Sequence, residues 1–324
     1  MRFSVAQWSP EYGMPVDPEL EDASTEVDAA VEMPLAEWRG ILPDVESVED
    51  VLFVDGVRRV DATLWIDQPE GRPALGLAAT YAAGAVRSNG HAEVVAASVD
   101  RGLFTSVSGA ADVVTRCGTY GVRATTGQSP EELWLGIQQR MGELEGSVAA
   151  ANVGASLVVV DGPLSHRRHV EGAVGYVKRE HVEYLPPELW DVKYGLAVAR
   201  RSPLFLTSSV WSRYSWYLRL ARGASAAEGL VRCEVAADMD LATAVRLADR
   251  ISATLPRFAS APHKDPRAPE NLYPIAGLAR ELRRRLGDQH LMYRALRRAA
   301  SPVQTSPAFP AELRPVVASP ATPR

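Results

Sequence analysis

The sequence predicts an α/β fold in which a mixed central sheet is flanked by helices. Two short apolar runs rich in β-branched residues, 51–54 and 157–160, have the length and composition of buried strands. Between them, Ser129 is followed by a proline and two glutamates, which is a typical helix start. Strand-like and helix-like segments then alternate as far as about residue 300. This alternation is typical of α/β domains.

The boundaries of the expected elements follow from apolar periodicity and turn residues. Before the long helix, strands are expected at residues 51–56, 59–66, 74–86 and 92–98, whereas residues 99–127 have no clear pattern. The long helix runs from Ser129 to about residue 151. Later strands are expected at residues 155–161, 172–178, 204–207, 214–220 and 230–235. Later helices are expected at residues 186–199, 240–255, 274–286 and 289–299.

The two ends of the chain differ in composition from the middle. Residues 1–48 are acidic and contain one plausible helix at about 29–39, so we expect an N-terminal arm that packs on the domain or on a partner. Residues 301–324 are rich in Pro, Ala and Ser and almost uncharged, which predicts a disordered tail. Residues 49–300 then form a single domain.

Composition narrows the class of protein. No apolar run among the 324 residues approaches the roughly 20 residues of a membrane span. The N-terminus has no signal-peptide core, and two cysteines, Cys117 and Cys233, are too few for a disulfide framework or a zinc site. These features predict a cytoplasmic protein that does not bind membranes.

Charge is unevenly distributed along the chain. Residues 1–54 hold thirteen acidic residues against two arginines, a balance of −11, so the remainder carries +6 of the total of −5. Seven of the arginines fall between Arg280 and Arg298, against Glu281 and Asp288. This run is compatible with a DNA track, a dimer face or a charged helical surface. A mildly basic body is compatible with a nucleic-acid partner.

The most informative feature is an Asp-Gly pair that follows each of the two apolar runs. Asp55-Gly56 follows residues 51–54, and Asp161-Gly162 follows residues 157–160. A carboxylate at the end of a buried strand is costly to desolvate unless a cation meets it. A turn is the simple interpretation of one such pair, but two copies favour carboxylates that converge on a metal and a phosphate. Basic residues follow both copies: Arg58, Arg59, Arg167, Arg168 and His169.

A third acid lies late in the long helix, between the two Asp-Gly pairs. The order of three strands, a helix with Glu143 and Glu145, and a strand ending at Asp161 is the element order of the ribonuclease-H-like fold. Hydrolysis of a phosphodiester can use two divalent ions to activate water and stabilise the leaving oxygen. Such hard ions prefer carboxylate oxygens. We therefore expect Asp55, Glu145 and Asp161 to bind two Mn²⁺ or Mg²⁺ ions. Glu143 and Glu145 are two positions apart on a helix and point in different directions, so only one of them can be a metal ligand.

Other residues are candidates for contacts with substrate. Lys178 could neutralise the scissile phosphate or position the attacking water, although an exposed strand-end lysine is nearly as plausible. The five basic residues after the Asp-Gly pairs suit phosphate contacts. Tyr214 and Tyr217 alternate with basic residues and could stack on single-stranded bases, although an ordinary core strand fits the same pattern.

At these positions the sequence resembles the NurA family, DNA-end-processing nucleases that work with the hexameric ATPase and translocase HerA. The resemblance covers roughly residues 50–300 and rests on short stretches at residues 53–59, 144–145, 159–164, 175–178, 201–205, 214–220 and 271–275. It implies a Mn²⁺- or Mg²⁺-dependent homodimeric nuclease with 5′–3′ exonuclease and single-strand endonuclease activities. It also implies a role in resection of DNA double-strand breaks, at the nucleoid, and a tyrosine of the family matches the 214–217 region.

Two positions depart from the family pattern. Val57 stands where the first motif commonly has serine, and residues 278–281 stand where many relatives have a histidine. Glu281 is a conceivable substitute for that histidine as a fourth ligand.

Two alternatives remain open. An actin-like ATPase or sugar kinase shares this core but needs Gly- and Thr-rich phosphate loops, which the residues after Asp55 and Asp161 do not supply. The other is a catalytically inactive subunit that binds DNA or the translocase.

Overall fold

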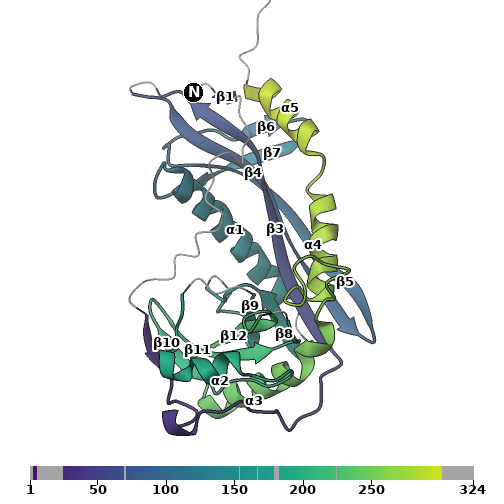
Figure 1. Ribbon diagram of the computed structural model, residues 1–324. Helices are drawn as coiled ribbons and strands as arrows, with labels where there is room; N and C mark the ends of the chain where they lie inside the picture. Colours follow the sequence, from purple (N-terminus) through teal and green to yellow (C-terminus); the bar gives the residue numbers. More distant parts are fainter. Residues whose placement is uncertain are drawn as a thin grey trace, which may run out of the picture.

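The fold is described from a computed structural model that covers residues 3–5, 25–68, 71–152, 154–165, 167–178, 182–223 and 225–300. Within these residues, twelve strands form one mixed sheet in the order β2-β10-β11-β12-β9-β8-β3-β4-β5-β7-β6, with β1 (Phe3–Val5) pairing to β3. Helices flank the sheet (Figure 1). The predicted α/β class with a mixed sheet flanked by helices is therefore confirmed. The predicted tail at 301–324 lies outside the described residues.

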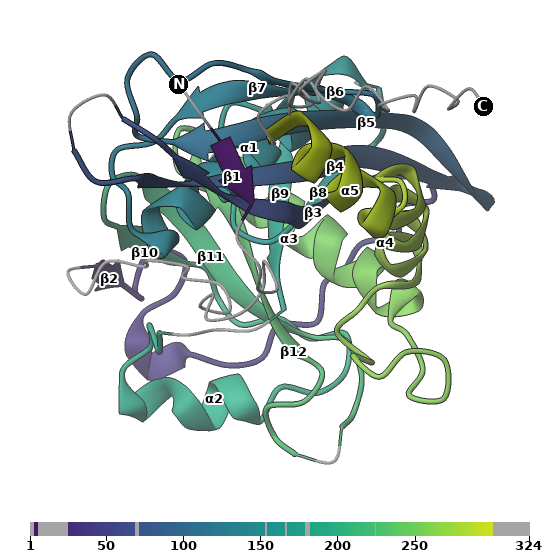
Figure 2. The same cartoon turned by 90° about the horizontal axis from the view of Figure 1, so that it is seen from above.

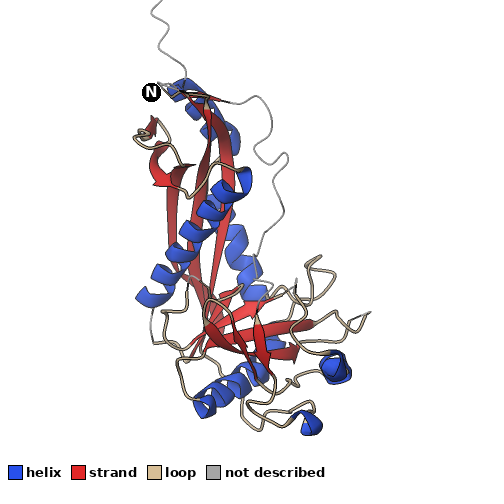
Figure 3. Cartoon of the chain, turned by 90° about the vertical axis from the view of Figure 1, so that its left-hand side faces the viewer, coloured by secondary structure: helices blue, strands red, loops and turns tan. Residues whose placement is uncertain are grey.

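Three long antiparallel strands form one end of the sheet. They are β3 (Val51–Ile66), β4 (Ala74–Asn89) and β5 (His91–Thr105). The short strand β7 (Gly118–Ala124) pairs in parallel with β5, and β6 (Val113–Thr115) pairs with β7. Figure 3 shows long strands extending upward from the lower part of the molecule, with helices alongside them. Residues 51–56 and 59–66 are strand as predicted, but the predicted break between them is wrong, because Asp55 and Gly56 keep pairing with Gly84 and Ala83 and β3 runs through without a turn.

The other end of the sheet begins where β8 (Leu157–Asp161) joins β3. β8 pairs in parallel with residues 51–54 of β3 only, and β9 (Ala173–Val177) runs parallel to β8. Beyond residue 54, β3 leaves β8, so the sheet divides there. Antiparallel strands then follow: β12 (Leu230–Ala236), β11 (Ser212–Arg219), β10 (Phe205–Ser208) and β2 (Glu26–Asp28).

Helices cover both faces of β3 and β4. α1 (Pro130–Ala151) places Leu133 and Ile137 against residues such as Val60, whereas α4 (Tyr273–Arg285) places Leu278 and Leu282 on the opposite face. α3 (Leu241–Thr254) packs into the same core as α4, and α5 (Gln289–Ala300) follows α4 towards β1 and β6 (Figure 2). No helix in the described part of the chain is long and apolar enough to cross a membrane.

One predicted helix is much shorter than expected. Residues 186–199 contain only a 3-10 turn (Pro187–Leu189) and the short α2 (Trp190–Tyr194). The helix ends at Gly195. Beyond it, the backbone of residues 195–204 turns and makes hydrogen bonds to other segments of the chain.

The described part of the N-terminal arm packs on the domain. The predicted helix at 29–39 is wrong, since only Leu35–Glu37 form a 3-10 turn. The Glu32 carboxylate accepts hydrogen bonds from Arg201 at 2.8 and 2.9 Å, and the Trp38 indole donates to the carbonyl of Ala29. Tertiary contacts thus replace helical hydrogen bonds in this segment.

Candidate functional site

Asp55 and Asp161 lie side by side where the sheet divides. In the parallel register of β3 and β8, Val54 is opposite Val160, so each aspartate is the next residue on its strand. Asp55 sits within β3, which continues beyond it, whereas Asp161 ends β8. The open edge of β3 beyond Asp55 borders a pocket of about 1290 Å³ that both aspartates line.

Gly56 brings the third acid to this point. A Cβ at position 56 would collide with the Glu145 carboxylate and would lie 2.9 Å from Cγ of Met141. The missing side chain therefore lets α1 approach β3 closely enough to place Glu145 beside the aspartates. Glu143 points away, since its side chain is 42% exposed and pairs with Arg140 at 2.7 Å. Glu145 is the helix acid that reaches the site.

Burial and mutual repulsion disfavour full ionisation of this cluster. Asp55 is 8% exposed, and desolvation, followed by the negative charge of Asp161, raises its pKa well above the usual value. Burial likewise raises the pKa of Glu145, against the opposing effect of Arg167. One oxygen of Asp55 accepts the Gly56 N–H at 2.8 Å, and the other has no hydrogen-bond partner among the described residues.

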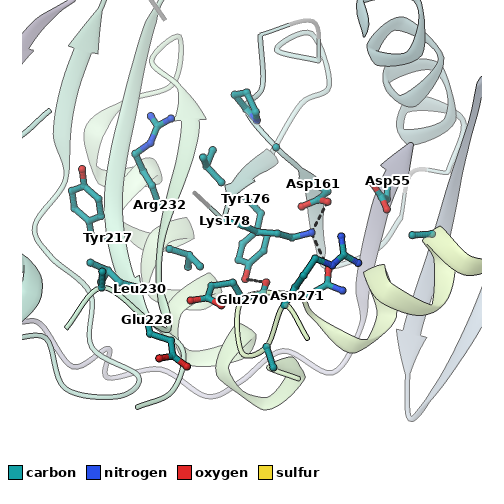
Figure 4. Close-up of a pocket in the computed structure, with 18 of the residues that line it drawn as sticks. Asp55, Asp161, Tyr176, Lys178, Tyr217, Glu228, Leu230, Arg232, Glu270 and Asn271 are labelled. Atoms are coloured by element: carbon teal, nitrogen blue, oxygen red, sulfur yellow. Dashed lines mark hydrogen bonds and ion pairs between the residues drawn. The ribbon is translucent and has the colours of Figure 1, made fainter. Parts of the chain in front are cut away.

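Two cations already contact the other acids. Lys178 Nζ donates to Oδ2 of Asp161 at 2.6 Å and to Oδ1 of Asn271 at 3.0 Å (Figure 4). The buried Arg167 donates to Glu145 and to the backbone carbonyls of Asp161 and Pro163. These contacts partly neutralise three carboxylates that would otherwise repel one another.

The carboxylate oxygens of the three acids suit a hard divalent cation, although the side chains do not surround a common point as they stand. Among the described residues, no three His, Cys, Asp or Glu side chains are arranged to hold an ion as they stand. The unpartnered oxygen of the buried Asp55 and the adjacent Asp161 nevertheless supply oxygen ligands of the type that Mg²⁺ and Mn²⁺ prefer. Glu145 would join them on exchanging its contact with Arg167.

The predicted DNA contacts are only partly brought together. Arg58 and Arg167 line the pocket, and the Arg58 guanidinium lies 4.8 Å from the ring centroid of Trp134. Arg59 instead pairs with Asp61 at 2.7 Å and donates to the carbonyl of Gly287. The bond to Gly287 fastens β3 to the connection between α4 and α5.

Arg168 and His169 face a different hollow. They are exposed and line a second pocket of about 750 Å³ beside α3. Arg167, from the same loop, points inward and lines the first pocket. Neighbouring residues of one basic cluster therefore line different pockets.

The two tyrosine candidates also separate. Tyr214 is partly buried against the main core, which favours the core-strand interpretation of this position. Tyr217 is 2% exposed, stacks on Phe205 with ring centroids 5.5 Å apart, and carries Lys193 Nζ 4.2 Å above its ring. It lines the pocket, but Figure 4 shows it at the opposite end from Asp55. Its position suits shaping of the pocket better than contact with reacting atoms at the acids.

The proposed substitute for a fourth ligand lies outside the pocket. Glu281 pairs with Arg284 at 3.3 Å and Arg285 at 2.9 Å on the surface of α4. The residues of α4 that line the pocket are Ala279 and Arg283.

Sequence reasoning missed Asn271 as a site residue. It is 1% exposed, accepts from Lys178, and donates to Asp265. Asn271 belongs to a stretch that carries the family resemblance, but its position 93 residues after Lys178 gives no local signal of the contact.

The sequence matches none of the protein-family models against which it was compared, and no curated protein matches it significantly. Fold and side-chain geometry are therefore the basis for a proposal about function.

Proposed function

We propose that the protein is a metal-dependent deoxyribonuclease with a ribonuclease-H-like core. The observation that carries the proposal is the convergence of Asp55, Glu145 and Asp161, from β3, α1 and β8, at one wall of a large pocket. Three antiparallel strands, a helix and two strands parallel to the first support the ribonuclease-H-like core.

Asp55, Asp161 and Glu145 would hold the divalent ions, Mn²⁺ or Mg²⁺. Bound there, the ions would activate water near neutral pH and stabilise the leaving oxygen of a phosphodiester. Lys178, fixed by Asn271, would place its ammonium beside a phosphate held at Asp161. Arg58, Arg267 and Arg283 add positive charge to the walls of the pocket, which favours a polyanionic substrate.

The finer proposals rest on the resemblance to NurA. They are 5′–3′ exonuclease and single-strand endonuclease activities, a homodimer, a HerA-type hexameric partner, and end resection of double-strand breaks in the cytoplasm at the nucleoid.

A catalytically inactive subunit that binds DNA or the translocase is the second candidate. It is favoured by one specific observation: Lys178 and Arg167 already neutralise Asp161 and Glu145. In a binding subunit these ion pairs would be permanent, whereas in a nuclease they would exchange when ions bind.

Digestion of end-labelled single- and double-stranded DNA separates the two candidates. The nuclease proposal predicts cutting with Mn²⁺ or Mg²⁺, none with EDTA, and a loss of at least about 100-fold in Asp55→Asn, Asp161→Asn and Glu145→Gln. Glu143→Gln, two residues from Glu145 on the same helix, is the matched control and should cut normally. If the wild type, alone and with a HerA-type ATPase, cuts under no metal, the binding-subunit proposal replaces the nuclease.

A further inference from the structure

An arginine ridge runs along α4 and α5, beside the three acids of the site. It comprises seven exposed arginines: Arg280, Arg283, Arg284, Arg285, Arg294, Arg297 and Arg298. Against Glu281 and Asp288 they give residues 280–298 a net charge of +5, in a chain whose total is −5. Such a concentration on one pair of helices creates a local positive field in an otherwise acidic protein.

The spacing of the ridge arginines is the same on both helices. Residues 280, 283 and 284 on α4 and residues 294, 297 and 298 on α5 follow the pattern i, i+3, i+4. This pattern places three guanidinium groups on one stripe of each helix. The opposite faces are buried, as Leu278, Leu282 and Leu296 show. The helices are thus anchored by their apolar faces and present their arginines outward.

Local acids leave part of the ridge charge available. Glu281 pairs with Arg284 and Arg285, and Asp288 accepts the Leu291 N–H at 2.8 Å. In the part of the chain that the structure describes, Arg280, Arg283 and Arg294 make no ion pair. Exposed arginines without carboxylate partners are free to contact phosphates.

The ridge is continuous with the acidic pocket. Arg283 lines the pocket, as does Arg267 from the segment before α4. Figures 1 and 2 show α5 following α4 along one side of the long strands. At about 1.5 Å per residue, helical residues 280–285 rise about 9 Å and residues 289–298 about 15 Å along the axes of their own helices, the lengths of roughly three and four base pairs of DNA.

We propose that the arginine ridge binds the phosphate backbone of duplex DNA whose end enters the acidic pocket. This inference rests on the proposal that DNA is the substrate and adds the surface that holds it. The stripe of α5 at residues 290, 294, 297 and 298 consists of one histidine and three arginines and has no Phe, Tyr or Trp for stacking on single-stranded bases. Its contacts are therefore those of a sequence-independent backbone site.

Duplex binding in EDTA, where no cleavage occurs, tests the ridge. The two triple variants are R280Q/R283Q/R284Q and R294Q/R297Q/R298Q, because glutamine preserves helix propensity. R72Q/R116Q/R246Q, which changes three exposed arginines elsewhere, is the matched control. Fluorescence anisotropy across a salt series should show roughly tenfold weaker binding in each ridge variant, and a salt slope smaller by about 2 to 3. The control variant should bind as the wild type does, and melting temperatures verify folding.

Unchanged affinity and salt slope in both ridge variants would overturn the inference. A change in oligomeric state with unchanged DNA binding would also overturn it and would identify the ridge as an interface between copies of the chain. The proposed hydrolysis fails separately: no cleavage under any metal, together with reduced salt slopes, leaves the ridge standing as a DNA-binding surface.

Discussion

At the scale of single residues, Gly56 controls how closely α1 approaches β3. Its missing Cβ leaves room for the Glu145 carboxylate and Met141, and this proximity places Glu145 beside Asp55. The Asp-Gly pair was interpreted from the sequence as a strand end with a possible turn. Gly56 instead lies inside a continuous strand, where it lets the Glu145 side chain come close to β3.

Gly56→Ala should therefore destabilise the protein. The added methyl group meets Glu145 and Met141 in a packed site, and overpacking of this kind typically costs about 1–3 kcal/mol. Urea unfolding measures the difference. Gly277→Ala is the control, since a Cβ there meets nothing within 4 Å on α4, and it should stabilise the protein by about 0.5–1 kcal/mol. Equal stability of Gly56→Ala and wild type would contradict the close approach.

Asp55 should make the metal-free protein less stable as pH rises. Its pKa in the folded protein lies above the ordinary value of 3.8, so ionisation costs the folded state more than the unfolded chain. Its contribution is fully present below that ordinary value and is lost as pH rises through the raised pKa. The loss amounts to about 1.4 kcal/mol for each unit by which the pKa is raised.

Unfolding of wild type and Asp55→Asn in EDTA, between about pH 4 and pH 8, tests this pH dependence. The variant should gain stability relative to the wild type as pH increases, while the raised pKa of Glu145 leaves it a smaller dependence of its own. If the stabilities of wild type and Asp55→Asn changed with pH in parallel, the pKa of Asp55 would not be raised in the folded protein.

At the scale of elements, local signals predicted the start of α1 and the strand residues of β3, but they did not predict that β3 is continuous. The start of α1 was predicted because Ser129 and Glu132 form a capping box that needs only neighbouring residues. The continuity of β3 depends on 15 pairs with β4, which no local pattern reveals. The predicted helices at 29–39 and 186–199 failed for the same reason, since tertiary contacts determine the backbone there.

Ser129→Ala should weaken α1 and, through it, the position of Glu145. The Ser129 hydroxyl accepts the Glu132 N–H at 3.2 Å, and the Glu132 carboxylate accepts the Ser129 N–H at 3.0 Å. Loss of such a cap costs about 1 kcal/mol in chemical denaturation. Ser147→Ala is a control on the same helix, because Ser147 bonds only to the helical carbonyl of Glu143. A cost no larger than that of Ser147→Ala would show that the cap contributes little.

At the scale of the whole molecule, two chain segments more than 100 residues apart supply the adjacent aspartates. The repeated Asp-Gly pattern predicted both of them, and the helix between them predicted Glu145. Sequence reasoning could not predict that Arg167 binds Glu145 or that Asn271 binds Lys178. These contacts join segments that meet only in the folded chain. The basic residues were likewise predicted as one set, yet the fold distributes them over two pockets and a contact with the connection between α4 and α5.

Calorimetric titration of Mn²⁺ into the metal-free protein tests the central claim most directly. If Asp55, Asp161 and Glu145 are the ligands, wild type and Glu143→Gln should bind Mn²⁺ alike, whereas Asp55→Asn and Asp161→Asn should bind it at least about tenfold more weakly. Equal Mn²⁺ binding by all four proteins, or no binding by the wild type, would contradict a metal centre at the division of the sheet.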